Sequence, residues 1–254
     1  MPTEADTCRT YIVPKLHAAG WEDDFIAEQR VIAPGRIVPL GHKHIRQESR
    51  RPDYILFLRR NYPIAVVEAK AAYKKPADGM QQALNYAGML GVKFAYASNG
   101  TGIVEHDFIT GQERAIAAFP TPDELWRRLR SDLQLPNDKA ANDALTAYFE
   151  EVGSKAPRYY QTSAINRTVE AVLRGQSRIL ITMATGTGKT FVAFQIVWRL
   201  WKTKRKKRIL YLADRNVLID QAKDRTFSPL GEALHKIQGE ATKSREVYFA
   251  LYRR

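Results

Sequence analysis

Residues 183–190 read Met-Ala-Thr-Gly-Thr-Gly-Lys-Thr, and this stretch decides the fold of the second half of the chain. An apolar run at residues 178–183 precedes it and predicts a strand, and residues 189–202 have the apolar spacing of a helix. A second apolar run at residues 209–213 is followed by a helix that begins near residue 216. Strand, helix and strand in this order predict a parallel βαβ unit.

The glycine-rich stretch itself has the chemistry of a phosphate-binding loop. Gly186 and Gly188 allow the backbone to turn its N–H groups toward an anion. Lys189 supplies a positive charge for the β- and γ-phosphates of a nucleotide, and Thr190 supplies a hydroxyl for Mg²⁺. The usual pattern has a glycine where this chain has Met183, and the alternative is a Gly-Thr turn that binds nothing. The predicted residues for binding ATP are Gly186, Thr187, Gly188, Lys189 and Thr190.

Around this loop the chain resembles the ATPase motor of superfamily-two helicases. Residues 158–161 read Arg-Tyr-Tyr-Gln, and the resemblance implies that Gln161 reads adenine; the alternative is an ordinary surface glutamine. Residues 214–216 resemble the next motif of that family, which implies a DNA-backbone contact for Arg215. The alternative is that Asp214 or Asn216 only caps a helix. No Asp-Glu pair follows residues 214–216, where that family has its acidic pair, and the arginine finger of its second motor lobe is also absent. We therefore expect this chain on its own to bind nucleotide without turning it over.

The first part of the chain alternates short apolar runs with turns. Two pairs of such runs predict β-hairpins at residues 54–69 and 94–108, the second with Asn99-Gly100 at its turn. Residues 78–90 predict a helix between the hairpins. A helix over residues 4–19 and a strand over residues 25–33 are predicted before them.

These elements predict an α/β protein with two domains and a connector. A mixed-sheet domain is expected over residues 1–119. Residues 120–157 predict a helical connector, which is broken at Pro136 and ends in a Gly- and Pro-containing linker. The parallel-sheet region is expected over residues 158–254.

The first predicted hairpin carries two acids and a lysine at its open end, because residues 52–53 read Pro-Asp and residues 68–70 read Glu-Ala-Lys. Folding the hairpin midway, at residues 60–61, brings Asp53 opposite Glu68, and Lys70 shares the face of Glu68. Cross-strand neighbours lie about 4.5–5.5 Å apart, close enough to share a metal ion. Two carboxylates suit Mg²⁺, and a lysine suits the charge of phosphodiester hydrolysis. The alternative is a salt bridge on a solvated hairpin.

This P-D…E-x-K pattern resembles the restriction-endonuclease-like nucleases. Gln82 and Tyr86, four residues apart on the predicted helix, resemble the Q-x-x-x-Y element of RecB-like nucleases. With both motifs in one sequence, the chain resembles the N-terminal portion of the restriction (motor-nuclease) subunit of a type I restriction–modification enzyme. The resemblance implies a restriction-endonuclease-like mixed-sheet domain, followed by the start of a RecA-like helicase lobe.

The resemblance also implies roles for individual residues. Asp53, Glu68 and Lys70 are expected to be catalytic, with the two acids as metal ligands and Thr190 as the ligand of the nucleotide-bound metal. Glu4, in a segment that resembles the opening helix of the family, is expected to be a further acid near the metal.

The implied function is a Mg²⁺-dependent endonuclease that cuts double-stranded DNA after ATP-driven translocation. The implied partners are the modification (methyltransferase) and specificity subunits of the same enzyme. Two alternatives stay open at this point. One is an ATP-dependent helicase whose nuclease fold is degenerate and only binds DNA, and the other is a non-enzymatic chain that binds DNA and partner proteins.

Composition agrees with a nucleic-acid partner. Lys and Arg number 40 against 27 Asp and Glu, which leaves a net charge of +13 that attracts polyanions. Arg50 and Arg51, with Lys43 and Arg46 before them, are expected to contact DNA near the predicted hairpin site. The basic run at residues 202–208 predicts a surface loop, either solvated or in contact with DNA.

Composition also excludes several classes of protein. No apolar run reaches about 18 residues, so no membrane span is expected. A single cysteine, Cys8, cannot form an internal disulfide, which favours a reducing, cytoplasmic setting. One cysteine and five histidines cannot build a cysteine-rich zinc site.

Overall fold

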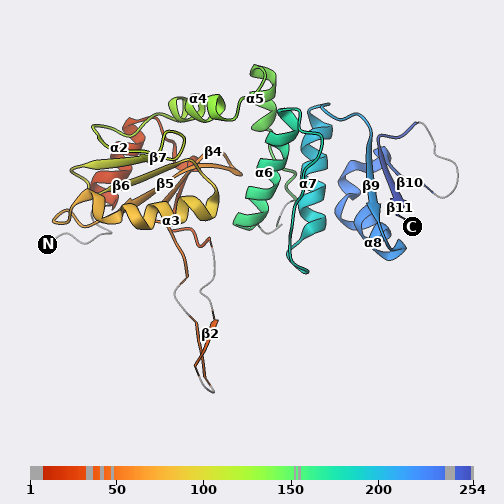
Figure 1. Cartoon of the computed structure of the whole chain (residues 1–254), viewed down its shortest axis with the longest axis horizontal. Helices are drawn as coiled ribbons and strands as arrows, with labels where there is room; N and C mark the ends of the chain where they lie inside the picture. The colour runs from red at the N-terminus through yellow and green to blue at the C-terminus, as the bar shows by residue number, and fades with distance from the viewer. Residues whose placement is uncertain are drawn as a thin grey trace. The chain divides into compact units, whose positions relative to one another are not determined.

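The computed structural model describes residues 8–32, 37–40, 43–46, 49–151, 153, 156–237 and 244–252. The chain divides into two compact units (Figure 1). Unit 1 comprises Met1–Asn137 and Ala156–Ser163, and unit 2 comprises Asp138–Lys155 and Ala164–Arg254. The domain boundaries that the sequence predicts, at residues 119 and 157, are separate from this division and remain predictions.

Unit 1 contains a six-stranded mixed sheet in the order β1-β4-β5-β6-β7-β8 (Figure 1). Every neighbouring pair is antiparallel except β5 and β6, which are parallel and are joined through the helix α3. Both predicted hairpins are confirmed, as β4–β5 and β6–β7. The strands are β1 Ile26–Glu28, β4 Tyr54–Arg59, β5 Tyr62–Ala69, β6 Phe94–Ser98, β7 Ile103–Asp107 and β8 Gln112–Ile116. A separate two-stranded pair consists of β2 Ile37–Leu40 and β3 Lys43–Arg46.

One hydrophobic core cluster of unit 1 lies between the sheet and α3, which runs from Met80 to Leu90. Met80, Ala83, Ala87 and Leu90 recur at helical spacing and pack against buried residues of β4, β5 and β6. A 3-10 turn, η3 Pro76–Gly79, precedes α3, and Gly91 ends it in the left-handed conformation with φ of 71°. The predicted helix at residues 78–90 is therefore confirmed.

Before the sheet, the predicted helix is confirmed over the described residues 8–18, whereas the predicted strand is shorter than expected. The opening segment forms a π-helical turn, η1 Cys8–Ile12, and a helix, α2 Val13–Ala18, and a 3-10 turn, η2 Asp23–Phe25, precedes β1. The strand predicted over residues 25–33 is correct only for β1, because the backbone turns at Gln29, which has a positive φ of 43°.

A buried charge cluster ties β6, β7 and β8 of unit 1 to the helix α4 Pro122–Asp132. Glu105 on β7 accepts hydrogen bonds from the Tyr96 hydroxyl (2.8 Å), from Arg114 (3.0 Å) and from Arg128 of α4 (3.0 Å). Arg128 also pairs with Asp107. Burial by itself raises the pKa of the Glu105 carboxyl, but the hydrogen bonds from Arg128 and Tyr96 and the Arg128 charge outweigh burial and lower it.

Unit 2 contains a parallel three-stranded sheet in the order β10-β11-β9, which confirms a parallel sheet in this half of the chain. Its aromatic core includes Phe194, Phe227 and Phe249. The strands are β9 Ile209–Ala213, β10 Leu234–Lys236 and β11 Val247–Leu251. The helical elements are α5 Asp138–Ala144, α6 Tyr159–Leu173 (in unit 2 from Ala164), α7 Lys189–Lys202, α8 Asn216–Gln221, η4 Ala222–Thr226 and η5 Ser228–Ala233.

The strand predicted at residues 178–183 is wrong. These residues form an irregular segment, and the Leu180 side chain is 90% exposed. A strand needs a hydrogen-bonded neighbour, and none of the described strands pairs with this segment. After the break at Pro136, the described part of the predicted helical connector is helical only in α5, which ends at Ala144. Among the described residues, no helix is both long enough and apolar enough for a membrane crossing.

Candidate active site and phosphate loop

Asp53 and Glu68 lie beside each other where β4 begins and β5 ends. The two strands pair Tyr54 with Val67, so continuing the register by one residue brings Asp53 opposite Glu68. The backbone N–H of Asp53 donates to Glu68 Oε1 (3.2 Å), and the backbone N–H of Ala69 donates to Asp53 Oδ2 (2.8 Å). The predicted juxtaposition is therefore present, although bulges near Phe57 interrupt the ladder closer to the turn.

The electrostatics of this pair favour a bound cation. Glu68 is only 1% exposed, and its burial, together with the neighbouring Asp53 carboxylate, raises the pKa of Glu68 to about 8. The Asp53 N–H and the Lys70 charge act in the opposite direction but do not compensate. Two carboxylates that repel each other in a buried place are hard oxygen ligands of the kind that Mg²⁺ prefers.

The donor set fits a Mg²⁺ ion that shares its coordination with substrate and water. Within the described residues there is no group of three or more His, Cys, Asp or Glu side chains that could hold a metal. Mg²⁺ commonly binds through one or two carboxylates and completes its shell with water and substrate phosphate oxygens. Asp53 and Glu68 meet that requirement.

Lys70 is connected to the helix α3 by a chain of side-chain hydrogen bonds. Its ammonium donates to Gln82 Oε1 (3.3 Å), and Gln82 Nε2 donates to the Tyr86 hydroxyl (3.4 Å). The start of α3 approaches closely because residue 79 is glycine: a Cβ there would lie 3.3 Å from both Glu68 Cβ and Lys70 Cε. The structure thus brings together Asp53, Glu68, Lys70, Gln82 and Tyr86.

The other residues predicted near this site are not all placed by the structure. Glu4 lies outside the described residues, and the side chains of Lys43 and Arg46 in β3 also lie outside them. Arg50 and Arg51 are exposed, and the Arg50 guanidinium lies 3.2 Å from the Met89 sulfur on α3.

The phosphate loop in unit 2 has the backbone conformation that its glycines predict. Gly186 and Gly188 adopt positive φ angles of 76° and 86°, and α7 begins directly after them. The Lys189 ammonium lies 3.3 Å from the carbonyl oxygen of Met183 and 3.2 Å from that of Ala184. The Thr187 hydroxyl also donates to the Ala184 carbonyl (2.6 Å). The lysine therefore lies folded over the loop that is expected to hold phosphate.

Gln161 is buried, and its amide oxygen accepts a hydrogen bond from the backbone N–H of Arg158 (2.9 Å). The alternative of an ordinary surface glutamine is therefore wrong. Its amide oxygen is engaged at the start of α6.

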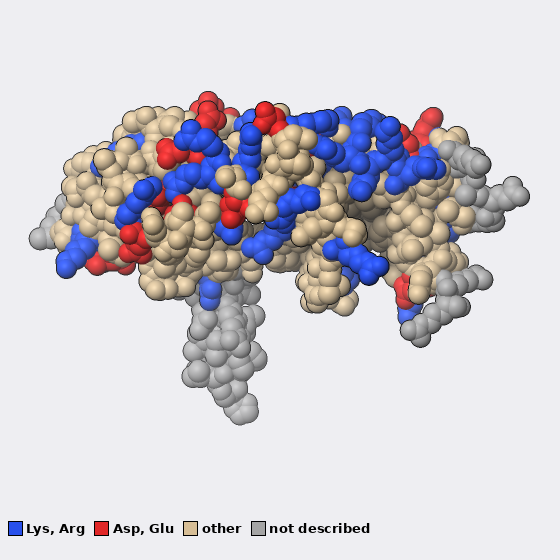
Figure 2. All heavy atoms as spheres, turned by 45° about the horizontal axis from the view of Figure 1, so that its top comes forward, with Lys and Arg blue, Asp and Glu red and all other residues tan. Residues whose placement is uncertain are grey.

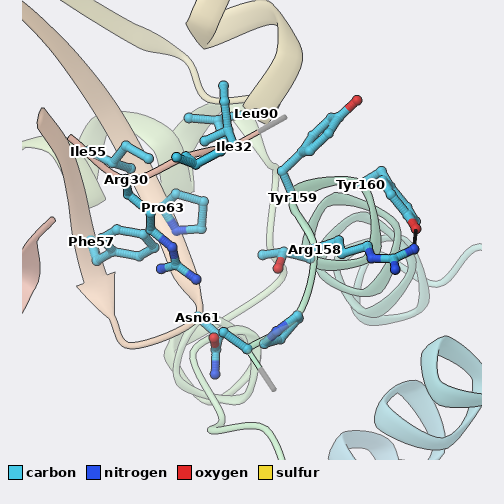
Figure 3. Close-up of a pocket in the computed structure, with 14 residues that line it drawn as sticks. Arg30, Ile32, Ile55, Phe57, Asn61, Pro63, Leu90, Arg158, Tyr159 and Tyr160 are labelled. Atoms are coloured by element: carbon cyan, nitrogen blue, oxygen red, sulfur yellow. Dashed lines mark hydrogen bonds between the residues drawn. The ribbon is translucent and has the colours of Figure 1, made fainter. Parts of the chain in front are cut away.

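A pocket of about 330 Å³ in unit 1 was not predicted from the sequence (Figure 3). The Arg30 guanidinium lies over the Phe57 ring, 5.7 Å from its centre, and Arg158 donates to the Tyr160 hydroxyl (2.8 Å). Gln161 is not among its lining residues. These are Arg30, Val31, Ile32, Ile55, Phe57, Asn61, Pro63, Leu90, Ala156, Pro157, Arg158, Tyr159, Tyr160 and Thr162.

Arg215 is placed at the start of α8 with a largely exposed side chain, 3.9 Å from the Asp214 carboxylate. Arg215 is the N-cap residue of α8, and its own side chain makes no capping hydrogen bond. The basic run at residues 202–208 forms a surface turn between α7 and β9, as predicted. Figure 2 shows a face on which Lys and Arg side chains clearly outnumber acidic ones.

Comparison with known proteins points to type I restriction enzymes. Residues 37–114 match the family model described as type I restriction enzyme R protein N terminus. The EcoAI endonuclease subunit of Escherichia coli, a type I restriction enzyme subunit, is 41% identical to this chain over an alignment of 264 positions that covers 98% of the chain. Over almost its whole length, the chain is similar to the R subunits of type I restriction enzymes.

Further matches support this assignment. Residues 154–253 match the family model described as type III restriction enzyme, res subunit. The EcoKI endonuclease subunit of Escherichia coli strain K12 is 35% identical over 143 residues, or 52% of this chain and 12% of that subunit. A solved fragment structure assigned to an HsdR subunit from Vibrio vulnificus YJ016 is 49% identical to this chain, with a TM-score of 0.87. The match covers 98% of this chain and 47% of the Vibrio chain. The chain spans 32% of the length of the EcoAI subunit.

Proposed function

We propose that unit 1 of this R-subunit relative is a Mg²⁺-dependent DNA endonuclease with a restriction-endonuclease-like fold. The observation that carries the proposal is the convergence of Asp53, Glu68 and Lys70, with Lys70 hydrogen-bonded to Gln82 of α3. The EcoAI and EcoKI relatives are described as endonuclease subunits, which agrees with this activity.

In the proposed reaction each residue has a defined task. Asp53 and Glu68 would hold the metal ion, which would supply a more acidic bound water and polarise the scissile phosphate. Gln82 positions the Lys70 ammonium, which orients the attacking water and neutralises charge that develops on the phosphate. Tyr86 positions Gln82 in turn. The small Gly79 lets α3 approach closely enough for this chain of contacts.

We propose that unit 2 belongs to a RecA-like, ATP-driven DNA-translocating motor. The phosphate groups of ATP would replace the carbonyl oxygens that now contact Lys189, and Thr190 would ligate the Mg²⁺ that accompanies ATP. The start of α7 adds the positive end of a helix dipole at the same place. Arg215, exposed after β9, would contact the DNA backbone. For Gln161, at the start of α6 in unit 1, adenine recognition is proposed on the family resemblance alone.

The proposed substrate is double-stranded DNA, and the proposed partners are the modification (methyltransferase) and specificity subunits in the cytoplasm. A net charge of +13 favours binding to the phosphate backbone. Such contacts carry no base information, so selection of the recognition site falls to the specificity partner. The alternative of a degenerate nuclease fold is disfavoured because both acids, the lysine and the Gln82 support are present together.

The nuclease proposal is tested by plasmid nicking with Mg²⁺ or Mn²⁺, using the chain, Glu68→Gln and Lys70→Ala. Glu22→Gln, which changes an exposed glutamate of the same unit, is the matched control. We expect metal-dependent nicking by the chain and by the control, and its loss in both site variants. Nicking that survives in Glu68→Gln, or that proceeds without metal, would overturn the proposal.

A further inference from the structure

The loop that follows Lys70 presents an exposed aromatic ring among positive charges. Tyr73 is 66% exposed, and Lys74 and Lys75 beside it are exposed as well. The loop lies between the end of β5 and η3, so it directly adjoins the proposed cleavage site. A tyrosine that packs in a hydrophobic core is buried, whereas the Tyr73 side chain is largely exposed.

This loop is held in a defined shape by the side chain of Asn99. Asn99 Nδ2 donates to the Lys74 carbonyl oxygen (2.7 Å) and to the Ala72 carbonyl oxygen (3.5 Å). Its Oδ1 accepts from the backbone N–H groups of Thr101 (3.1 Å) and Gly102 (2.9 Å), which fixes the amide within the β6–β7 turn. The loop is thus ordered before any ligand binds, so little conformational entropy is lost on binding.

The opening helical segment adds a second tyrosine and another lysine to the same turn. Lys15 donates to the Gly100 carbonyl oxygen (2.5 Å), and the Tyr11 side chain is partly exposed. Tyr11 packs directly on the turn, because a Cβ at Gly100 would lie 2.8 Å from Tyr11 Cβ. The shared β6–β7 turn therefore joins two exposed tyrosines to a group of lysines: Lys15, Lys70, Lys74 and Lys75.

A ligand for this surface must combine negative charge with flat, apolar rings. Lysines attract phosphates, and tyrosine faces stack on nucleic-acid bases. In a duplex the faces of the bases are covered by their neighbours, so a tyrosine face needs a base that has left the stack. An unpaired DNA strand satisfies both requirements.

We propose that the loop at residues 71–75 grips an unpaired strand of the DNA next to the cut, with Tyr73 stacked on one base. This inference rests on the proposed nuclease function, because it places the grip beside the strand being cleaved. Tyr73 acts as a positioning residue, since it holds the strand and does not touch the reacting phosphate.

The test measures binding of a fluorescent single strand of about 12 nucleotides and of the matching duplex by anisotropy. The strand contains 2-aminopurine, whose fluorescence is quenched by stacking. The experiments are done in EDTA, which prevents metal-dependent cutting. A loss of single-strand binding can therefore be distinguished from a loss of nuclease activity. The variants are Tyr73→Ala, Tyr73→Leu and Tyr73→Phe. Tyr252→Ala is the control, since Tyr252 is 61% exposed and belongs to unit 2.

We expect Tyr73→Ala and Tyr73→Leu to weaken single-strand binding by about tenfold and to reduce the quenching, because each stacked base contributes that order of affinity. Tyr73→Phe should retain both the single-strand affinity and the quenching of 2-aminopurine fluorescence. The control and all duplex affinities change by less than about twofold. Unchanged single-strand affinity in Tyr73→Ala, an equal loss in Tyr252→Ala, or an equal loss for the duplex would overturn the proposal.

Discussion

Replacing Glu68 with glutamine is predicted to stabilise the metal-free protein, increasingly so as the pH rises. Glu68 is buried against Asp53, and these two causes raise its pKa from 4.5 to about 8 in the folded state. The folded protein therefore holds this proton more tightly than the unfolded chain does. Between about pH 4.5 and pH 8 the free energy of unfolding falls with rising pH, and above pH 8 the loss is complete.

The size of the effect follows from the two pKa values. One pKa unit corresponds to about 1.4 kcal/mol, so a carboxyl raised from 4.5 to about 8 destabilises the folded protein by at most about 5 kcal/mol. Glutamine keeps an oxygen that can accept the Asp53 N–H and carries no charge. Allowing for relaxation of the site, we expect a gain of about 2–4 kcal/mol at high pH. This corresponds to a rise in melting temperature of roughly 5–10 °C.

The assay is thermal unfolding followed by circular dichroism in EDTA, over a range from about pH 5 to pH 9. The protein is compared with Glu68→Gln and with the exposed control Glu22→Gln. The melting temperatures of the protein and of Glu68→Gln should nearly coincide at the acid end and diverge toward the basic end. Mg²⁺ should then raise the melting temperature of the protein but not that of Glu68→Gln. A difference that does not vary with pH, or equal stabilisation of both by Mg²⁺, would refute the reasoning.

Three further predictions concern substitutions at Arg128, Gly79 and Lys189. Arg128→Met leaves the Glu105 carboxylate buried without its main partner, so urea unfolding should show a loss of about 3–5 kcal/mol. Because the pKa of Glu105 is lowered in the folded state, the unmodified protein should lose this stability as the pH falls below about 4.5, and Arg128→Met should lose less. Gly79→Ala places a methyl group 3.3 Å from carbon atoms of the proposed active site, and should slow plasmid nicking while circular dichroism stays unchanged. Lys189→Ala should abolish binding of a fluorescent ATP analogue, whereas Lys206→Ala, in the basic surface turn, should not.

The local part of the site follows from the sequence because strand pairing has simple geometry. Counting from the turn brings Asp53 opposite Glu68, and the observed register agrees. Helical spacing likewise puts Gln82 and Tyr86 on one face. The hydrogen bond from Lys70 to Gln82 depends on how α3 packs on the sheet, and periodicity alone does not contain that information.

The remaining features depend on contacts between distant segments. Glu105, Arg114 and Arg128 have the composition of a solvated surface, yet both arginines, from two other elements, converge on the buried Glu105 carboxylate. Asn99 was predicted only as a turn residue, but its side chain also organises the loop after Lys70. The apolar run at residues 178–183 has strand composition and no pairing neighbour among the described strands, so composition alone gave the wrong prediction.

The most direct test of the central claim is to locate a metal ion by anomalous X-ray scattering from crystals soaked in Mn²⁺. The account predicts an anomalous peak between the carboxylates of Asp53 and Glu68, and no such peak in crystals of Glu68→Gln. A well-ordered pair of carboxylates without a peak, or a peak that persists in Glu68→Gln, would contradict the assignment of this pair as the metal site of a nuclease.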